Sequence, residues 1–250
     1  LCPGGVPAPG ANEGRDCNQQ FLQQGGGNAN LEPEKAKNFT LGFQFEPVQD
    51  LSFGVDFWWV RLKNSINAFP EQAIFGDPVR YADRFVRAPD GSLTPDGDTP
   101  GFIVATNDNL GEINTNGVDL NANYRYKLQG MGAINVGFVG TYVRKYEFQR
   151  EIDGPFLQNA GIFVDFGVIP RWKHSLTLAY STGNWSVGVN NTFTNGYRDE
   201  NFVDDEFLNE VGDYSVWDLF AAISPTQALT LSAGIKNVLD KDPPYSNQSQ

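Results

Sequence analysis

The sequence predicts an all-β protein, an antiparallel segment of a transmembrane β-barrel with about eight strands. Three observations predict this fold. Apolar and polar residues alternate with period two, the alternating runs are about ten residues long, and short turns alternate with long loops. Successive strand side chains point to opposite faces, so each run carries one apolar and one polar face. About ten residues is also the length at which a tilted strand crosses a bilayer.

The clearest alternation lies in residues 30–67, where large apolar side chains occupy every second position of two successive runs. A soluble β-sandwich also alternates, but it seldom carries aromatic side chains at nearly every outward position of two adjacent strands of this length. We therefore expect strands at about 36–46 and 51–62, joined by a turn at 47–50. The alternating apolar residues are Phe39, Leu41, Phe43, Phe45, Leu51, Phe53, Val55, Phe57 and Trp59.

Six further strands are predicted, at about 113–127, 134–148, 176–180, 185–193, 217–223 and 229–235. Short turns separate them near 128–133, 181–184 and 225–228, and long loops are expected at 63–112, 149–168 and 199–213. The Pro, Gly and Asp content of residues 63–112 predicts a loop there. Transmembrane barrels have short periplasmic turns and longer extracellular loops, and the chain shows this asymmetry.

Composition excludes some classes of protein. No apolar run approaches the roughly 18 residues of a membrane helix, and a mean hydropathy of −0.38 is compatible with strands that have a polar inner face. The net charge of −12 and the scattered basic residues argue against nucleic acid as a partner. No charged and then apolar signal segment begins at Leu1, and the abrupt ends of the chain suggest an excised or processed product.

The two cysteines, Cys2 and Cys17, flank a loop rich in Gly and Pro with no further Cys or His near enough to complete a metal site. We expect a disulfide between them, which implies an oxidising compartment. Closing a loop of about 15 residues removes about 3 kcal/mol of unfolded-chain entropy in the simple model. Two free thiols in a disordered tail remain the alternative.

Several segments resemble a known family. The run NLEPEKAKNFTLGFQFEPVQDLSFGVDFWWVRLKNSI is similar to the segment of TonB-dependent outer-membrane receptors in which Asn, Leu, Pro and Glu precede a strand pair. GEINTNGVDLNANYRY resembles the strand after the next surface loop, and VWDLFAAI with LTLSAGIKNVLDKDPPYSN resembles the penultimate strands. The resemblance covers most of residues 28–247. The plug domain, the TonB-contacting segment and the last strand, which ends in an aromatic residue, are missing from it.

The resemblance implies that these strands are about eight of a presumed 22-stranded barrel, roughly its strands 14 to 21. On this view residues 1–35 are a surface loop, 36–239 hold the strands and loops, and 240–250 begin another surface loop. A complete barrel of eight strands is the structural alternative, because eight strands is the smallest complete barrel.

Candidate ligand-binding residues gather in the loop 63–112, where arginines are interleaved with aromatic residues. They suit an anionic ligand held by bidentate hydrogen bonds and stacking, or a short helix whose charges face water or lipopolysaccharide. These residues are Arg80, Tyr81, Arg84, Phe85 and Arg87. A second set is expected to face the barrel lumen, toward water, the plug or substrate: Asp56, Asp119, Asn121, Asn123 and Arg125.

Catalytic and metal chemistry is scarce. His174 has no Ser or Cys nucleophile pattern around it, so we expect a histidine at a strand end and a protein that is not an enzyme. An acidic cluster in 199–213 offers oxygens for Ca²⁺, but its spacing matches no calcium motif, which favours a solvated acidic loop. Its members are Asp199, Glu200, Asp204, Asp205, Glu206, Glu210 and Asp213. No metal and no cofactor are predicted.

The resemblance implies a place in the bacterial outer membrane and part of a receptor barrel for energy-coupled uptake of a scarce ligand such as a siderophore, vitamin or oligosaccharide. The implied partners are outer-membrane lipid and lipopolysaccharide, the ligand, and TonB through the plug. The alternative function is a passive outer-membrane channel or a small eight-stranded surface barrel with adhesive loops.

Overall fold

The computed structural model describes residues 21–93, 98–164, 167–199 and 209–246, which form two compact units. The first unit, called the lobe below, comprises Leu1–Ala36, Leu62–Ile113 and Gln149–Phe156. The second, called the sheet unit, comprises Lys37–Arg61, Asn114–Phe148 and Leu157–Gln250.

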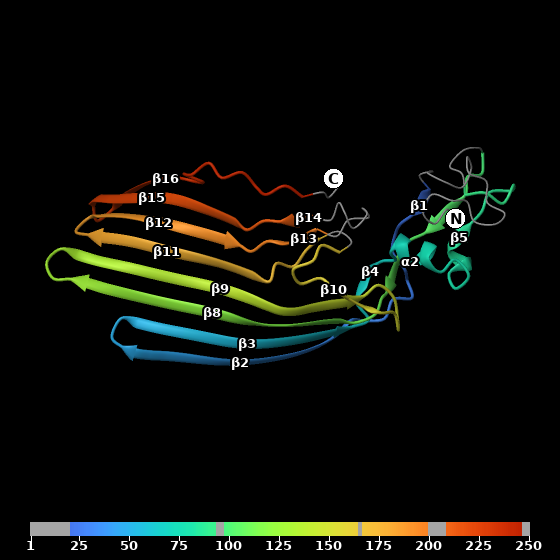
Figure 1. Cartoon of the computed structure of the whole chain (residues 1–250), viewed down its shortest axis with the longest axis horizontal. Helices are drawn as coiled ribbons and strands as arrows, with labels where there is room; N and C mark the ends of the chain where they lie inside the picture. Colours follow the sequence, from blue (N-terminus) through green and yellow to red (C-terminus); the bar gives the residue numbers. More distant parts are fainter. Residues whose placement is uncertain (1–20, 94–97, 165–166, 200–208, 247–250) are drawn as a thin grey trace. The chain divides into compact units, whose positions relative to one another are not determined.

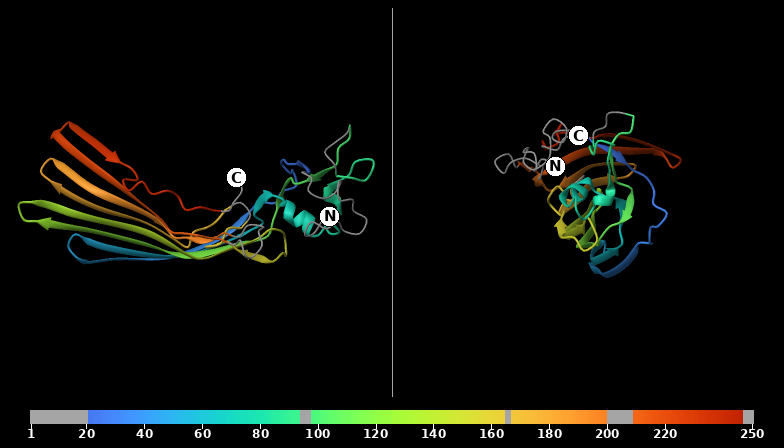
Figure 2. Two further views of the ribbon diagram at one scale, coloured as in Figure 1. Left: turned by 45° about the horizontal axis from the view of Figure 1, so that its top comes forward. Right: turned by 90° about the vertical axis from the view of Figure 1, so that its right-hand side faces the viewer.

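Eight long strands lie side by side in one open sheet, in the order β16-β15-β12-β11-β9-β8-β3-β2 (Figure 1). The registers that join β9, β11, β12, β15 and β16 are antiparallel. A short strand, β10 (Phe156–Gln158), also pairs with β9. Figure 2 shows that the sheet curves. The long strands are β2 (Lys35–Val48), β3 (Leu51–Lys63), β8 (Ile113–Leu128), β9 (Gly132–Gln149), β11 (Trp172–Thr182), β12 (Trp185–Thr194), β15 (Tyr214–Thr226) and β16 (Leu229–Ile235).

All eight predicted strands are confirmed, and the tight turns between them lie where the sequence predicts. Asp50, Gly130 and Gly183 occupy three of these turns with φ values of 65°, 70° and 50°. This left-handed region favours Gly and tolerates Asp, so these residues are compatible with the reversal of chain direction in each turn.

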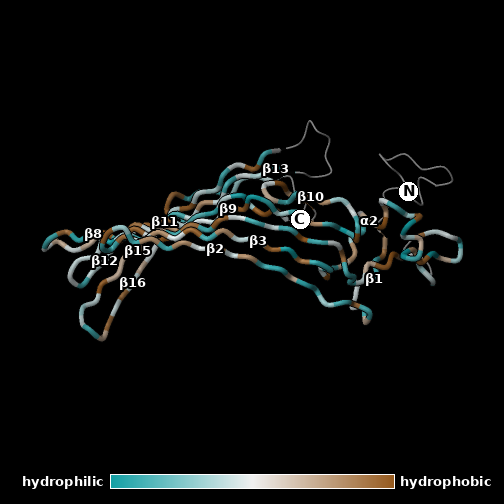
Figure 3. The backbone as a smooth tube through the Cα atoms, turned by 90° about the horizontal axis from the view of Figure 1, so that it is seen from below, coloured by the Kyte–Doolittle hydropathy of each residue, from teal (hydrophilic) through white to brown (hydrophobic). Residues whose placement is uncertain are grey.

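The registers give the sheet two chemically different faces. Leu178 of β11 lies opposite Val136 of β9 and Val189 of β12, which places apolar side chains together on what we call the outer face. The next residue, Thr177, lies opposite Gly137 and Asn190 on the inner face. Hydropathy alternates along the strands accordingly (Figure 3).

Glycines extend the inner face across β2, β3 and β8. A Cβ on Gly42 would overlap the carboxylate of Asp56, and a Cβ on Gly54 would overlap the side-chain amide of Asn121. These close approaches mean that Gly42 shares a face with Asp56, and Gly54 with Asn121. Odd-numbered residues of β2 and β3 therefore lie on the opposite, outer face.

Aromatic side chains gather at both ends of the outer face. Near the loop end of the strands the ring of His174 stacks on Phe193 with centroids 5.0 Å apart. Near the turn end Tyr180 meets Trp185 at 5.5 Å. Trp172 and Tyr180 are eight residues apart on β11, about 27 Å along a strand at about 3.4 Å per residue. With a tilt of about 40° this spacing spans about 20 Å, close to the apolar band of about 25 Å between aromatic girdles.

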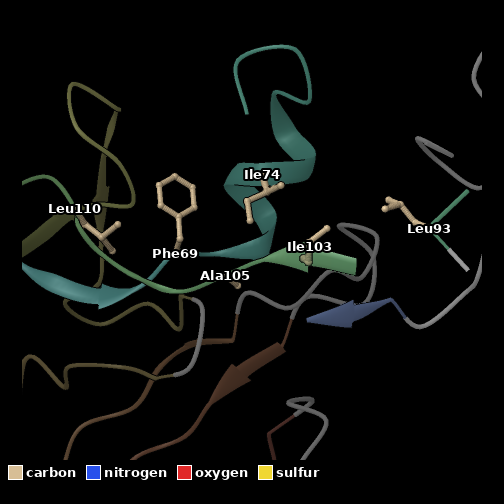
Figure 4. Close-up of a cluster of buried hydrophobic side chains, with 6 residues drawn as sticks. All are labelled: Phe69, Ile74, Leu93, Ile103, Ala105 and Leu110. Carbon is tan, nitrogen blue, oxygen red and sulfur yellow. The ribbon is translucent and has the colours of Figure 1, made fainter. Parts of the chain in front are cut away.

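The lobe has a small hydrophobic core of its own (Figure 4). Ile74 and Ile103 are completely buried at its centre. Around them β1 (Leu22–Gln24) pairs parallel with β6 (Phe102–Val104), and β5 (Phe85–Val86) pairs antiparallel with β6. The lobe also contains β4 (Ile66–Ala68), β7 (Asn107–Asn109), α2 (Glu71–Gly76) and the 3-10 helix η2 (Ala82–Arg84). The other buried core residues are Phe69, Leu93, Ala105 and Leu110.

The prediction that residues 63–112 are only loop is therefore wrong. Their apolar residues have no period, so sequence alone shows neither a strand nor a helix. Several of them nevertheless pack into one buried cluster. Strand pairings between distant segments, such as Leu22 with Phe102, frame this cluster. The other two predicted loops also contain short strands: β10 in 149–168, and in 199–213 the hairpin of β13 (Tyr197–Asp199) and β14 (Asn209–Val211).

The order of the sheet does not close on itself, since β2 and β16 stand at its two ends. The alternative of a complete eight-stranded barrel is therefore not the structure of this chain. Among the described residues, no helix combines the length and the apolar character needed to cross a membrane.

Candidate functional site

The inner face of the sheet unit carries a hydrogen-bonded layer of polar side chains. Thr141 Oγ1 donates to Asp119 Oδ1 at 2.7 Å, which joins β9 to β8. Asn190 Oδ1 accepts from the hydroxyls of Ser175 and Thr177 at 3.0 and 2.9 Å, which joins β12 to β11. A wall of hydroxyls, amides and charged groups of both signs suits contact with water or with a polar partner.

Near the turn end this face is hollowed by a concavity of about 980 Å³. Lys127 Nζ donates to Asp50 Oδ2 at 2.6 Å, and Arg125 N donates to Asp50 O at 2.9 Å, so the first strand turn is tied to β8 beside the concavity. Polar residues lining the concavity include Glu46, Asp50, Ser52, Asn123, Arg125 and Thr177.

The structure places the predicted lumen residues on this inner face. Asp56 approaches Gly42, Asn121 approaches Gly54, and Asp119 accepts from Thr141. Two more, Asn123 and Arg125, line the concavity. Sequence reasoning missed Ser175, Thr177 and Asn190. The signal that would have found them is their alternation with the apolar residues of β11 and β12.

The lobe brings together the predicted loop residues, but it uses them differently. Arg84 pairs with Asp108, donates to the carbonyl of Val104 at 3.3 Å and lies 3.9 Å from the ring centroid of Phe69. With a side chain only 15% exposed, Arg84 faces the interior of the lobe. Through these contacts Arg84 joins η2 to Val104 of β6 and Asp108 of β7 inside the lobe.

The other predicted lobe residues are more accessible. Arg80 forms an ion pair with Glu151 at 3.4 Å but keeps about half of its side chain exposed (49%). Arg87 is exposed, and it donates to the carbonyl of Gly91 at 2.9 Å. Tyr81 is half-buried, with its ring 5.0 Å from that of Phe69. Arg80 and Arg87 are therefore the members of the set that can offer N–H groups to a ligand.

His174 is the third residue of β11, near the loop end of this strand, and it lies on the outer face. Trp172 Nε1 donates to His174 Nδ1 at 2.8 Å, and aromatic rings surround the imidazole: Phe138 with centroids 5.6 Å away, Trp172 at 5.8 Å and Phe193 at 5.0 Å. These contacts make His174 part of the aromatic girdle near the loop end.

The acidic cluster is only partly described. Asp199 is completely buried and accepts from Ser246 Oγ at 2.9 Å, while Asp213 accepts from Gly196 N at 2.6 Å. Glu210 lies opposite Arg198 in the β13–β14 hairpin. In the part of the chain that the structure describes, no three His, Cys, Asp or Glu residues are placed to hold a metal ion. Outside the described residues lie Cys2, Cys17, Glu200, Asp204, Asp205 and Glu206.

Comparison with known families and structures adds an independent finding. The sequence model of the family described as TonB dependent receptor-like, beta-barrel, matches residues 5–238. No curated protein matches.

Solved structures share the fold of this chain. The ferric enterobactin receptor PfeA of Pseudomonas aeruginosa (G324V mutant) is 18% identical with a TM-score of 0.59 over 86% of this chain and 27% of its own. The FrpB iron transporter of Neisseria meningitidis (F3-3 variant) is 16% identical with a TM-score of 0.56 over 90% of this chain and 28% of its own. The siderophore receptor PirA of Acinetobacter baumannii is 15% identical with a TM-score of 0.54 over 88% of this chain and 29% of its own. The chain thus spans less than a third of these proteins.

Proposed function

The chain belongs to the family of TonB-dependent receptor β-barrels, and we propose that it supplies part of the wall of an outer-membrane barrel for energy-coupled uptake of a scarce ligand. Members of this family are outer-membrane proteins of Gram-negative bacteria, and this chain is located there. The observation that carries the proposal is the sheet itself, with an apolar outer face between aromatic girdles and a hydrogen-bonded polar inner face. A wall of this kind faces lipid on one side and an aqueous lumen on the other.

The two free edges of the sheet support its place in a larger barrel. β2 and β16 end the order of strands, so each carries one row of backbone N–H and C=O groups without a strand partner among the described residues. In hydrocarbon each unsatisfied group costs several kcal/mol, which is why membrane sheets close. Further strands of a larger barrel would satisfy both edges.

The proposal of energy coupling rests on the family to which the chain belongs. A TonB-dependent receptor takes the energy for uptake from the inner membrane. TonB delivers this energy by contacting a plug domain inside the barrel. On the polar inner face Asp119 already accepts a hydrogen bond from Thr141, so a plug packed against this part of the sheet would not bury that carboxylate without a partner.

For the ligand we propose a contact at the lobe, through Arg87 and the exposed half of Arg80. Arg87 has its guanidinium 5.7 Å from the ring centroid of Phe85, and Arg80 lies 5.3 Å from that of Tyr81. A guanidinium over an aromatic ring is prearranged to stack on a planar anionic ligand and to donate to it. The ligand classes are a siderophore, a vitamin or an oligosaccharide. Arg84 is assigned to the interior of the lobe instead.

A passive channel is the second candidate, because the same polar inner face would line a water-filled pore. The two candidates differ in their need for energy. Accumulation of ligand that stops when the proton-motive force is collapsed supports the receptor, whereas equilibration that continues supports the channel.

A further inference from the structure

Arg80 contacts a second segment of the lobe, residues 149–156, with two nitrogen atoms of its guanidinium. Arg80 Nη1 lies 3.4 Å from Glu151 Oε2 in an ion pair, and Arg80 Nη2 donates to the carbonyl of Ile152 at 3.3 Å. Both segments belong to the lobe. Because Arg80 is one of the two arginines assigned above to the ligand contact, a ligand must share its guanidinium with these partners or replace them.

The ion pair binds the carboxylate of Glu151 poorly. Charge-assisted N–H···O contacts are usually about 2.7–2.9 Å long, and this one is 3.4 Å. Glu151 Oε2 is nevertheless buried, and no described residue donates a hydrogen bond to it. A buried oxygen without a donor loses the hydrogen bonds that water would give it. An anion that fits Arg80 better can therefore replace Glu151, and the released carboxylate gains contact with water.

The backbone on both sides of Glu151 is held in place, so its carboxylate stays next to Arg80. Gln149 N donates to Glu112 O at 3.0 Å, and Gln149 Oε1 accepts from Glu112 N at 2.9 Å. Gly154 N donates to Glu151 O at 3.1 Å, which closes a tight turn. A group tethered in this way acts at a high effective concentration. Glu151 is thus a permanent internal competitor for the guanidinium of Arg80.

The guanidinium of Arg80 has hydrogen-bonding capacity that its present partners leave unused. It is planar, and its N–H groups form a fork that suits two oxygens of one carboxylate or phosphate. Here one arm meets a single oxygen of Glu151, and the other meets the uncharged carbonyl of Ile152. The guanidinium lies 5.3 Å from the ring centroid of Tyr81, and about half of the Arg80 side chain is exposed, so an anion can approach it from solvent.

Arg87, the second arginine of the ligand contact, has no such competitor. It donates to the carbonyl of Gly91 at 2.9 Å and lies near the ring of Phe85. Among the residues that the structure describes, no carboxylate forms an ion pair with Arg87. The two arginines thus differ, because an anion binds Arg87 directly but must displace Glu151 at Arg80.

We propose that Glu151 is a specificity-determining residue of the ligand contact. In the ligand-free protein its carboxylate occupies the place at Arg80 that an anionic group of the ligand takes. The ligand class that displaces it carries a carboxylate or phosphate group that binds both arms of the guanidinium, while neutral ligands leave Glu151 in place. The inference rests on the proposed ligand contact at Arg80, and it adds a residue that selects the ligand by charge.

The test measures binding of inorganic sulfate, an oxyanion that fits both arms of a guanidinium, to the full-length protein by isothermal titration calorimetry at constant ionic strength. Glu151→Gln removes the charge of the competitor and keeps its shape. Asp153→Asn is the matched control, because it removes the same charge from a nearby exposed side chain whose φ of 60° Asn tolerates. We expect Glu151→Gln to bind sulfate at least about threefold more tightly than the wild type, and the control to bind like the wild type.

Replacing Arg80 shows where the sulfate binds. The gain in affinity from Glu151→Gln should disappear when Arg80→Gln is added, because the anion and Glu151 compete for this one guanidinium. A merely structural ion pair would give no such coupling.

A second measurement uses the wild type and covers the case in which a variant fails to fold. Carboxylates of the full-length protein are labelled with a carbodiimide and an amine, in sulfate and in chloride of equal ionic strength, and the labelled residues are identified by mass spectrometry. Glu151 should be labelled more in sulfate than in chloride, whereas Asp153 should be labelled equally in both.

Equal or weaker sulfate binding by Glu151→Gln would overturn the proposal, and so would an equal gain in Asp153→Asn or a gain that persists without Arg80. Unchanged labelling of Glu151 in sulfate would overturn it as well. Ligand uptake decides the proposed function separately. Uptake that is unaffected by Arg80→Gln removes the ligand contact at Arg80, whereas the sulfate measurements decide whether Glu151 competes for an anion site there.

Discussion

Arg84 and Asp108 form an ion pair between η2 and β7 of the lobe, and the guanidinium of Arg84 also lies against the ring of Phe69. The arginine side chain is 15% exposed and the aspartate side chain 33% exposed. A residue whose sequence context suggests ligand contact thus holds two distant segments of the lobe together. Arg87, three residues later, remains exposed.

Replacing Arg84 should loosen the lobe. In Arg84→Ala the carboxylate of Asp108 loses its partner and Phe69 loses its covering cation, at a cost of about 1–3 kcal/mol because the pair is partly exposed. Hydrogen exchange at the amides of β6 and limited proteolysis within 63–112 measure the loosening. Arg87→Ala is the matched control and should leave both readouts unchanged. Equal protection in Arg84→Ala and the wild type would remove the structural role assigned to Arg84.

The two faces of the sheet should respond very differently to charge. Leu178→Arg places a cation near the middle of the outer face and should cost about 2–4 kcal/mol in a lipid bilayer. Thr177→Arg, on the adjacent residue, points to the inner face beside the concavity and should cost far less. Urea titration of the full-length protein in lipid vesicles gives both free energies of unfolding. Similar losses for the two variants would contradict the assignment of the faces.

Replacing a closely packed glycine of the inner face by a larger residue should destabilise the sheet. A Cβ on Gly117 would overlap the ring of Trp58 and the carbonyl of Tyr142, so Gly117→Ala should destabilise the sheet by about 1–3 kcal/mol through overpacking. Gly212→Ala is the control, because an added Cβ there meets no atom within 4 Å. Thermal unfolding of the two variants compares them, and a Gly117→Ala variant as stable as Gly212→Ala would mean that β3 and β8 are spaced differently.

Cys2 and Cys17 should be joined in material folded in the outer membrane. They lie outside the described residues, so the prediction stands on sequence alone: they flank a loop with no other covalent constraint. Mass spectrometry after alkylation without reductant should find no labelled thiol. Two alkylated cysteines under these conditions would show free thiols instead.

The long strands could be predicted because their alternation is local. Phe39 to Phe45 and Leu51 to Trp59 each display the period within one strand, and the tight turns at Asp50 and Gly183 limit where the strands end. Pairing order then follows from sequence order for neighbours joined by short turns.

The lobe could not be predicted because its structure depends on distant contacts. Ile74 and Ile103 are buried together although 29 positions separate them in the sequence, and neither belongs to a periodic run. The partner of Arg84 lies at 108, and no local pattern joins these two residues. The position of His174 on the outer face was missed for a different reason. Its place in the alternation was visible, but a polar ring there needs Trp172 as a hydrogen-bond donor.

The most direct test of the central claim is uptake of radiolabelled candidate ligands by cells that express the full-length protein, with and without an uncoupler of the proton-motive force. A solute that enters through a general porin serves as the control for membrane integrity. The account predicts that ligand accumulation stops with the uncoupler while entry of the control solute continues. Ligand uptake that persists unchanged with the uncoupler would contradict energy coupling and favour the passive channel.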